Sequence, residues 1–561
     1  MSRSSSAFWP MSPVSRRTML RTSLAVSAAA ALTGACSGGD GGGEPGDPGD
    51  LSGVEEGAMP DFQAGQQFQA TQDLTFTMLF PEWPEVPFRR DWMIWEEIAR
   101  RTRVSLDCTI VPLSDYVNKR SLLLNAGDAP MLIPLTYPGE ETPFAPSNSI
   151  LPVSDYIDLM PNLRARIQEW NLEPDIDRLR QTDGRYYVLP GLYEVPEPGF
   201  SLIYRLDVLD ELGLPVPETW DDVRASLEAM KERYPDVAYP FSDMYQGNAT
   251  LSFAAVTFGA RAGWGLGSGA MFDQDSESFI YGPATPQYRE LVDFFRGLVA
   301  DGLMDPESFT QETEVAQRKF ATGRSLVTST DAATVPTFQR QLTDSLGEGN
   351  FAVAKIPTPA GPAGPLMGAG RLWHGFVLPA SVRENPNFVA MLQFVDWLFY
   401  DMATKEFLIW GVEGTTYTKD SSGDRTLSED ITYMGINPSG GQDLEVEYGF
   451  GLNIFADGGT EDLIRSRLSE DEVAYQEAML ETREVVPEDP PAPLTAPEQE
   501  QATLLSTPLT DTVNTSTLEF ILGRQPMSQW DAYVDRLNSN GVDQYLDLMN
   551  SAYERFQEEN A

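Results

Sequence analysis

The side chains that point to a chemical role in this 561-residue sequence are aromatic rings beside Gly, Pro or acidic residues. They follow predicted strands or lie in predicted loops, and four charged residues accompany them. Flat rings bind the apolar faces of sugars, and carboxylate or guanidinium groups bind the hydroxyls at the rim. The pattern therefore predicts a saccharide site. The candidate ligand-binding set is Glu82, Trp83, Tyr137, Phe241, Asp243, Trp264, Arg371, Trp373 and Glu413.

Other rings are expected to belong to a hydrophobic core. Trp92 and Trp95 recur on one face of a predicted helix and are assigned to the core. Because the chain has 11 Trp and 20 Tyr, core packing stays the alternative for Trp83, Trp264 and Trp373 as well. For Arg371, a surface ion pair is the alternative to ligand binding.

The motifs of common catalytic sites do not occur in this sequence. His374 is its one histidine, so a His-based triad would depend on it alone. There is no Gly-x-Ser-x-Gly, His-Glu-x-x-His or Gly-x-x-x-x-Gly-Lys-Ser/Thr motif. We therefore expect no catalytic residues and a protein that is not an enzyme. A secreted carbohydrate-active enzyme stays the alternative, since sugar hydrolases also combine aromatic rings with paired carboxylates.

Neither a metal nor a cofactor is predicted. The segment "DQDSES", Asp273 to Ser278, alternates acids but lacks the Gly and the distal Glu of an EF-hand loop, so a solvated turn is expected. Cys108 lies in an alternating strand pattern and is expected to be a small buried residue.

Residues 1–36 have the order of an export signal. Arg16 and Arg17 precede an apolar run from Leu24 to Ala35, which is shorter than a membrane-spanning helix. The paired arginines resemble a twin-arginine signal peptide, and "LTGAC" resembles a lipoprotein cleavage box in which Cys36 becomes the lipidated N-terminus. These features predict an extracytoplasmic lipoprotein anchored to the outer face of the cell membrane.

The composition after this signal limits the class of partner. Residues 37–70 are rich in Gly, Pro and acids and are expected to form a flexible tether. The whole chain has 84 acidic and 39 basic residues, a formal charge of -45, which argues against nucleic acid as a partner. The remaining chain is long enough to bury a large core and to divide into two lobes.

Apolar patterns then alternate between strands and helices. Strands are predicted at 73–80, 103–111 and 129–135, with a helix at 87–102 and another from about Asp115, capped by Ser114. This order predicts a parallel sheet covered by helices, which is an α/β fold.

The most specific stretch runs from Ser201 to Pro235. It predicts a strand, a short helix that ends at Gly213, a Pro-containing turn, and a second helix that begins with a capping box. In this order, the stretch resembles a signature of the extracellular solute-binding proteins of ABC importers. The matching residues are Tyr204, Arg205, Asp207, Leu209, Gly213, Leu214, Pro217, Thr219, Trp220 and Asp222.

Three further segments resemble the same family in the same order. They are "DGRYYVLPG" (183–191), "AQRKFATGRSLV" (316–327) and "FVDWLFYDMATKEFLIWGVEGTTYT" (394–418), the last of which resembles the lipoprotein sugar-binding subgroup called LipO or YtcQ-like. The resemblance covers roughly residues 73–418.

The resemblance implies a two-lobed, type II periplasmic-binding-protein-like fold with discontinuous lobes joined by hinge strands. Lobe 1 is expected to contain 71–198 and 369–420, and lobe 2 to contain 199–368. An acidic insertion and C-terminal helical segment, 421–561, is expected mainly in lobe 2. Within it, residues 484–501 are expected to form an extended, Pro-rich crossing or surface arm.

The resemblance also implies partners. A small polar solute, above all a saccharide or oligosaccharide, would bind between the lobes, and the loaded protein would meet the membrane subunits of an ABC permease. A monomer is expected. A sensory or adhesive binding protein stays an alternative, since the sequence contains no permease, kinase or nucleotide-binding segment of its own.

Overall fold

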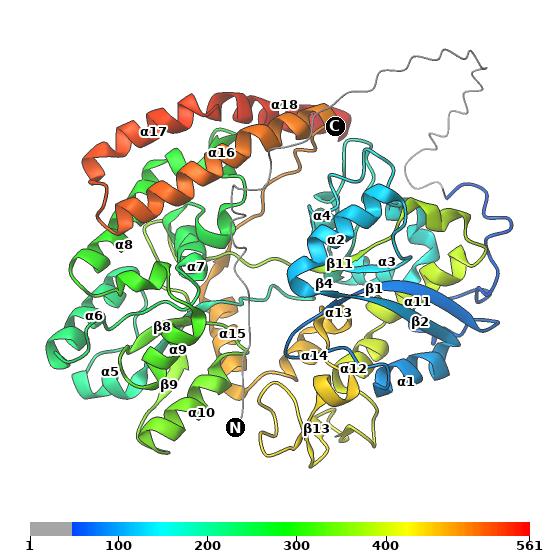
Figure 1. Ribbon diagram of the computed structural model, residues 1–561, viewed down its shortest axis with the longest axis horizontal. Helices are drawn as coiled ribbons and strands as arrows, with labels where there is room; N and C mark the ends of the chain where they lie inside the picture. Colours follow the sequence, from blue (N-terminus) through cyan, green and yellow to red (C-terminus); the bar gives the residue numbers. More distant parts are fainter. Residues whose placement is uncertain (1–47, 561) are drawn as a thin grey trace, which may run out of the picture.

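The protein has two α/β lobes side by side in a computed structural model that describes residues 48–560 (Figure 1). Each lobe has its own large hydrophobic core, one built from residues between Val54 and Leu463 and the other from residues between Leu202 and Tyr545. The export signal, Cys36 and the first part of the predicted tether lie outside the described residues.

Lobe 1 begins with the predicted alternation of strands and helices. Its first two strands pair in parallel, and Met78 of the first forms a parallel bridge with Leu132 beside the third, which confirms the parallel arrangement. The second helix begins earlier than expected, directly after Pro112, and has no side-chain cap. The elements are β1 (Leu74–Glu82), α1 (Met93–Thr102), β2 (Val104–Pro112), α2 (Leu113–Ala126) and β3 (Ile133–Thr136).

A second sheet of lobe 1 joins distant parts of the chain. Strand β11 lies between β3 and β4 and is antiparallel to both. Beneath it, every residue of α11 is buried, as its uninterrupted apolar sequence requires. The remaining elements are η1 (Val153–Leu159), α3 (Pro161–Glu169), α4 (Glu173–Asp177), β4 (Leu189–Leu192), β11 (Leu372–Val377), η5 (Ala380–Glu384), α11 (Phe388–Tyr400) and α12 (Met402–Trp410).

The prediction of a flexible tether up to residue 70 is wrong for its last part. Val54, Phe62 and Phe68 are buried in the core of lobe 1. The Met59 amide donates to the Gln393 side chain, which in turn donates to the Met59 carbonyl, at 2.8 and 3.1 Å. These few apolar residues within a Gly- and acid-rich stretch are enough to hold the segment on α11.

Lobe 2 contains the segment that carried the sequence resemblance. Its three-stranded sheet has the order β8-β5-β9 and is antiparallel throughout. The capping box of Thr219 and Asp222 forms as predicted, and Gly213 ends the preceding helix at φ 67°. The elements are β5 (Ser201–Arg205), α5 (Leu206–Leu212), α6 (Trp220–Arg233), α7 (Asn248–Phe258), η2 (Gly263–Leu266), β6 (Ala270–Asp273), β7 (Ser278–Tyr281), η3 (Gly282–Ala284), α8 (Pro286–Ala300), η4 (Pro306–Phe309), α9 (Thr313–Ala321), β8 (Val327–Thr330), α10 (Val335–Leu346) and β9 (Val353–Lys355).

The chain after residue 420 is divided between the lobes, whereas the sequence had placed it mainly in lobe 2. Residues from Leu427 to Leu463 contribute to the core of lobe 1, because their apolar side chains pack beside α12. These elements are β12 (Tyr417–Lys419), β13 (Arg425–Leu427), β14 (Ile431–Thr432), β15 (Gln442–Asp443), η6 (Leu444–Tyr448), α13 (Asn453–Ala456) and α14 (Glu461–Arg465).

The last three helices cover lobe 2 and lie across its upper edge in Figure 1. The first of them packs along α8 and the third along β7. The first of these helices, α16, begins with a capping box of Thr495 and Glu498. The predicted extended arm therefore ends at residue 495 rather than 501. The helices are α16 (Ala496–Ile521), α17 (Trp530–Ser539) and α18 (Val542–Asn560), with η7 (Met527–Gln529) between the first two.

Three parts of the chain connect the lobes. Residues 193–200 run from β4 to β5, and residues 357–371 return from β9 to β11. The third leaves α14 and continues through α15 (Glu470–Thr482), which lies between the lobes in Figure 1. Within these connections, β10 (Leu366–Met367) pairs in parallel with β16 (Glu484–Val485). The second and third connections are thus joined in a short hinge sheet.

Candidate functional site

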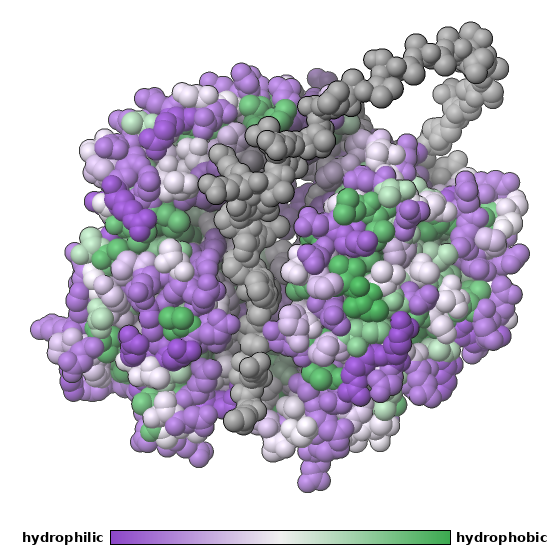
Figure 2. All heavy atoms as spheres, viewed as in Figure 1, coloured by the Kyte–Doolittle hydropathy of each residue, from purple (hydrophilic) through white to green (hydrophobic). Residues whose placement is uncertain are grey.

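Three aromatic side chains are exposed among the described residues: Tyr137, Trp264 and Trp373, at 37%, 48% and 46%. All three belong to the predicted ligand-binding set. On the face shown in Figure 2 the surface is mostly hydrophilic, with hydrophobic patches on both lobes. Rings of this size normally bury their apolar surface, so their exposure marks them as candidate binding surfaces.

On lobe 1, Tyr137 and Trp373 form a pair. Their ring centroids are 5.4 Å apart at an interplanar angle of 80°. Tyr137 follows β3 and Trp373 lies on β11, so the antiparallel pairing of these strands brings the two residues together. Trp373 is also paired with Gly191 of β4, two residues before the first connection between the lobes begins.

On lobe 2, Trp264 belongs to an aromatic triad with Phe200 and Tyr245. The centroid distances are 5.3 Å from Trp264 to each partner and 5.5 Å between the partners. The Tyr245 hydroxyl donates a hydrogen bond to the Asp331 carboxylate at 2.7 Å, which fixes the orientation of the Tyr245 ring. Phe200 stands at the end of the first connection, directly before β5.

The pair and the triad therefore lie at opposite ends of the same connection, residues 193–200. Trp373 marks its lobe 1 end through the β11 and β4 pairing, and Phe200 marks its lobe 2 end. In a two-lobed protein, this is the position from which two surfaces approach each other when the lobes close.

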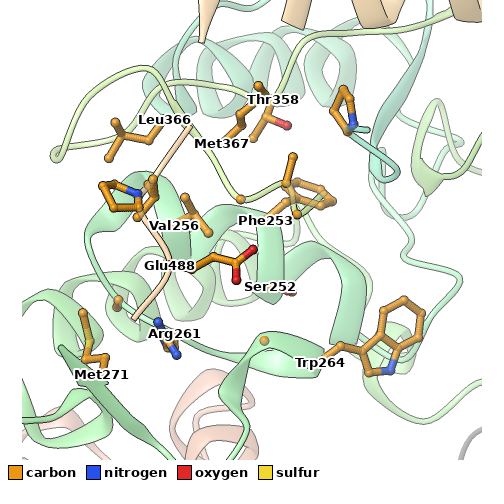
Figure 3. Close-up of a pocket in the computed structure, with 18 of the residues that line it drawn as sticks. Ser252, Phe253, Val256, Arg261, Trp264, Met271, Thr358, Leu366, Met367 and Glu488 are labelled. Atoms are coloured by element: carbon orange, nitrogen blue, oxygen red, sulfur yellow. The ribbon is translucent and has the colours of Figure 1, made fainter. Parts of the chain in front are cut away.

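A cavity of about 460 Å³ extends from the triad along α7 to the hinge sheet. Phe253 and Val256 line it from α7, and Met271, Leu366 and Met367 contribute further apolar surface (Figure 3). Its charged residues are Arg261, Glu488 and Asp489, and Trp264 borders it. The volume lies within the usual range for small-molecule sites in proteins.

Two predicted ligand contacts are structural instead. Phe241 is fully buried in the core of lobe 2, where it bridges Met304 and Val327. The Asp243 carboxylate accepts hydrogen bonds from the amides of Tyr245 and Gly247, at 2.8 and 2.7 Å, just before α7. Both predictions are wrong: the strand expected before these residues does not form, and Phe241 instead makes isolated bridges inside lobe 2.

Arg371 is also occupied by the fold. Its guanidinium donates to the carbonyls of Trp170 and Glu194, at 2.7 and 2.8 Å. It therefore joins lobe 1 to the start of the first connection. This arrangement differs both from the predicted ligand contact and from the surface ion pair that was the alternative.

The other members of the predicted set belong to lobe 1. Glu82 accepts from the Phe88 amide at 3.0 Å, and Trp83 is half-buried against the core of lobe 1. Glu413 is exposed in the loop after α12. Trp92 is buried and Trp95 packs against the same core, which confirms their assignment.

Buried ionisable groups lie behind the Tyr137 and Trp373 pair. His374 is fully buried, and its Nε2 lies against the Asp457 carboxylate. Lys405 donates to the Phe455 carbonyl at 2.8 Å, and burial lowers the pKa of its amine to about 7. The polar atoms of these residues contact other groups of lobe 1 and are buried away from solvent. This arrangement favours a structural role.

Cys108 is buried, as predicted, and burial raises the pKa of its thiol to about 12. The segment from Asp273 to Ser278 forms the turn between β6 and β7. Within residues 48–560, no cluster of His, Cys, Asp and Glu has the arrangement of a metal site.

Sequence reasoning missed several residues of the candidate site. Phe200, Tyr245 and Arg261 come from separate segments and carry no shared motif. Glu488 and Asp489 lie in the Pro-rich stretch whose role the sequence did not indicate. The one available signal was the adjacent acidic pair in a segment predicted to cross between the lobes.

Two α/β lobes, three connections and an antiparallel sheet in the second lobe define a class: the type II periplasmic binding proteins of ABC transporters. The family model described as "Bacterial extracellular solute-binding protein" matches residues 107–404, and the chain belongs to this family. No helix in the described part of the chain is long and apolar enough to cross a membrane.

Two curated relatives and one solved structure illustrate the similarity. The fructooligosaccharide ABC transporter substrate-binding protein FusA of Streptococcus pneumoniae is 29% identical over 238 residues, which cover 39% of this chain and 43% of FusA. The polygalacturonan/rhamnogalacturonan-binding protein YtcQ of Bacillus subtilis is 22% identical over 482 residues, which cover 82% of this chain and 88% of YtcQ.

The solved structure is an HMO-binding, ABC-transporter-associated solute-binding protein from Bifidobacterium longum infantis. It superposes with a TM-score of 0.67 at 16% identity and covers 87% of this chain and 99% of its own. At this identity the similarity establishes the two-lobed fold.

Proposed function

We propose that this protein captures a saccharide or oligosaccharide outside the cell and delivers it to an ABC transporter permease. The observation that carries the proposal is the exposure of Tyr137, Trp264 and Trp373 at the two ends of one interlobe connection. Exposed rings on both lobes suit a ligand with apolar faces that is held between them. The named ligands of FusA and YtcQ, a fructooligosaccharide and two polysaccharides, support the same class.

The proposed mechanism is ligand-driven closure of the lobes. A saccharide that touches Trp264 on lobe 2 and Trp373 on lobe 1 at once binds the closed form more tightly than the open one. That difference in affinity shifts the population toward the closed form. The permease would then recognise the closed form, and the protein acts as a monomer without a cofactor.

A thermal-shift screen of residues 48–561 against mono-, di- and oligosaccharides tests the proposal, with peptides and polyols as controls. A ligand that binds only the folded protein raises its melting temperature in a saturable way. A saturable shift with one class of saccharide, recovered unaltered, is expected. A shift with a peptide instead would replace the ligand class, and a hydrolysed sugar would favour the carbohydrate-active enzyme.

Membrane attachment through Cys36 is a second part of the proposal, supported by the sequence of the export signal. Expression of the full chain in a bacterial host that processes lipoproteins should incorporate labelled fatty acid, and Cys36→Ser should abolish the label. A label that persists in Cys36→Ser would contradict anchoring at this residue.

A further inference from the structure

The cavity beside the aromatic triad carries more negative than positive charge. Arg261 is the one Lys or Arg among the described residues that line it, whereas Glu488 and Asp489 are both carboxylates. Figure 3 shows Arg261 and Trp264 on opposite sides, with Glu488 extending between them. The charge of this cavity bears directly on which saccharides it accepts.

Arg261 is already paired. Its Nη2 lies 2.7 Å from Oδ1 of Asp489, and the two side chains are 34% and 23% exposed. The same Asp489 oxygen accepts from the Phe272 amide at 3.1 Å, which holds the carboxylate in place. Glu488 is paired in the opposite direction, with Arg178 of lobe 1 at 2.7 Å. Asp489 therefore already neutralises Arg261, and a carboxylate that approached the other N–H groups of Arg261 would be repelled by Asp489.

Two cations near the aromatic rings, Lys355 and Arg120, are also engaged by the protein. Beside Phe200, the buried Lys355 donates to the Gly199 carbonyl at 2.7 Å and to Glu472 at 2.8 Å. Below Tyr137, Arg120 is buried and pairs with Glu140 at 2.9 Å. The charges of Lys355 and Arg120 are therefore neutralised by Glu472 and Glu140.

A carboxylate that enters such a cavity loses hydration, meets a cation that Asp489 already neutralises, and is repelled by the carboxylates of Glu488 and Asp489. A neutral sugar loses less and covers the apolar wall formed by Phe253, Val256 and Met367 with its C–H faces. We propose that this site accepts neutral saccharides and rejects uronic acid oligomers. The inference rests on the proposed function. It predicts that the ligand of this protein differs from the polygalacturonan that is named for YtcQ.

Isothermal titration with matched ligands tests the inference on the folded domain. The charged probes are oligogalacturonates, and their methyl esters keep the same rings without the charge. A panel of neutral fructo-, xylo-, manno-, malto- and galacto-oligosaccharides accompanies them. We expect a neutral ligand to bind at least about tenfold more tightly than any uronate, with an affinity that changes little between low and high salt.

The outcomes distinguish this inference from the proposed function. Uronates that bind as tightly as the best neutral sugar overturn the inference and leave saccharide capture in place. If no saccharide of either kind binds, saccharide capture itself is overturned, and the inference that rests on it is overturned as well.

A single substitution tests the physical cause. Asp489→Asn keeps an oxygen for the Phe272 amide but releases the charge of Arg261. It should raise the ratio of uronate to neutral-sugar affinity by about tenfold or more. Asp275→Asn makes the same charge change in the exposed turn between β6 and β7 and should leave the ratio unchanged. If Asp489→Asn also leaves it unchanged, the Arg261 and Asp489 pair is not what excludes uronates.

Discussion

At the residue scale, the exposed rings are the clearest sign of a ligand. Trp264 and Trp373 keep nearly half of their surface in water, although burial of such a side chain is favourable by about 2 kcal/mol or more. Their partners hold them in place: Phe200 and Tyr245 on lobe 2, and Tyr137 on lobe 1. Rings that are fixed and exposed bind a ligand without losing much side-chain entropy.

Trp264→Ala is predicted to weaken saccharide binding by about tenfold or more, which corresponds to about 1.4 kcal/mol. Isothermal titration with the saccharide found by the thermal-shift screen measures the change. Leu504→Ala, which truncates an exposed apolar side chain on α16, is the control and should bind normally. Equal affinities for both variants would show that Trp264 is not part of the site.

Glu141 makes stability depend on pH. Its side chain is buried, and burial raises the pKa of the carboxyl to about 7. Between about pH 4.5 and 7 the folded chain therefore holds a proton that the unfolded chain has lost, so stability falls as the pH rises through this range. Glu141→Gln cannot titrate and should be more stable than the wild type above pH 7 by up to about 3 kcal/mol.

Urea unfolding at several pH values from 5 to 8 measures this difference between Glu141→Gln and the wild type. The advantage of the variant should grow with pH. The exposed Glu429→Gln serves as the control for removal of one charge. A constant difference across the range would mean that Glu141 is ionised throughout.

At the element scale, helix α11 organises lobe 1. All of its residues are buried, and its one carboxylate, Asp396, accepts from the amides of Asn162 and Leu163 at 2.9 and 2.8 Å. These amides belong to the first turn of α3, where no intrahelical acceptor exists. A side chain of α11 thus caps α3, although the two residues are 233 positions apart in the sequence. The local sequence of neither helix predicts this contact.

Asp396→Ala is predicted to lower the free energy of unfolding by about 3 kcal/mol, because it leaves buried amides without an acceptor. Asp158→Ala removes an exposed acid that pairs with Arg164 of the same helix α3, and should cost about 0.5 kcal/mol or less. Chemical denaturation of both variants measures the difference. Similar costs would contradict the capping role of Asp396.

At the scale of the whole molecule, the third connection ties the lobes together. Glu488 pairs with Arg178 of lobe 1, and its neighbour Asp489 pairs with Arg261 of lobe 2. Two consecutive acids therefore hold both lobes from one point beside the hinge sheet. Ion pairs that are partly exposed are weakened by salt, so this link responds to ionic strength.

Glu488→Gln is predicted to loosen the lobes without unfolding either of them. Small-angle scattering without ligand should give a larger radius of gyration for the variant than for the wild type, and high salt should bring the wild type closer to it. Glu500→Gln, an exposed acid on α16, is the control. Identical scattering of all three proteins would show that the Arg178 pair does not set the lobe arrangement.

The sequence by itself determined the class of fold and much of its local structure. Apolar periodicity located the strands and helices of the first lobe, and side-chain chemistry located Gly213 and the Thr219 capping box, because these features depend on neighbouring residues. It also named Tyr137, Trp264 and Trp373, since rings beside Gly or Pro after strands tend to lie on loops.

Only the tertiary structure decided which of the candidate residues turn outward. Phe241 and Asp243 were predicted to follow a strand, as Tyr137 does, yet Phe241 forms only isolated bridges and both residues are buried. The direction of a side chain depends on what packs against it from elsewhere in the chain. The allocation of residues 427–463 to lobe 1 and the pairing of Asp489 with Arg261 depend on contacts between distant segments. Such contacts leave no local pattern in a single sequence, and here they decide the charge of the proposed site.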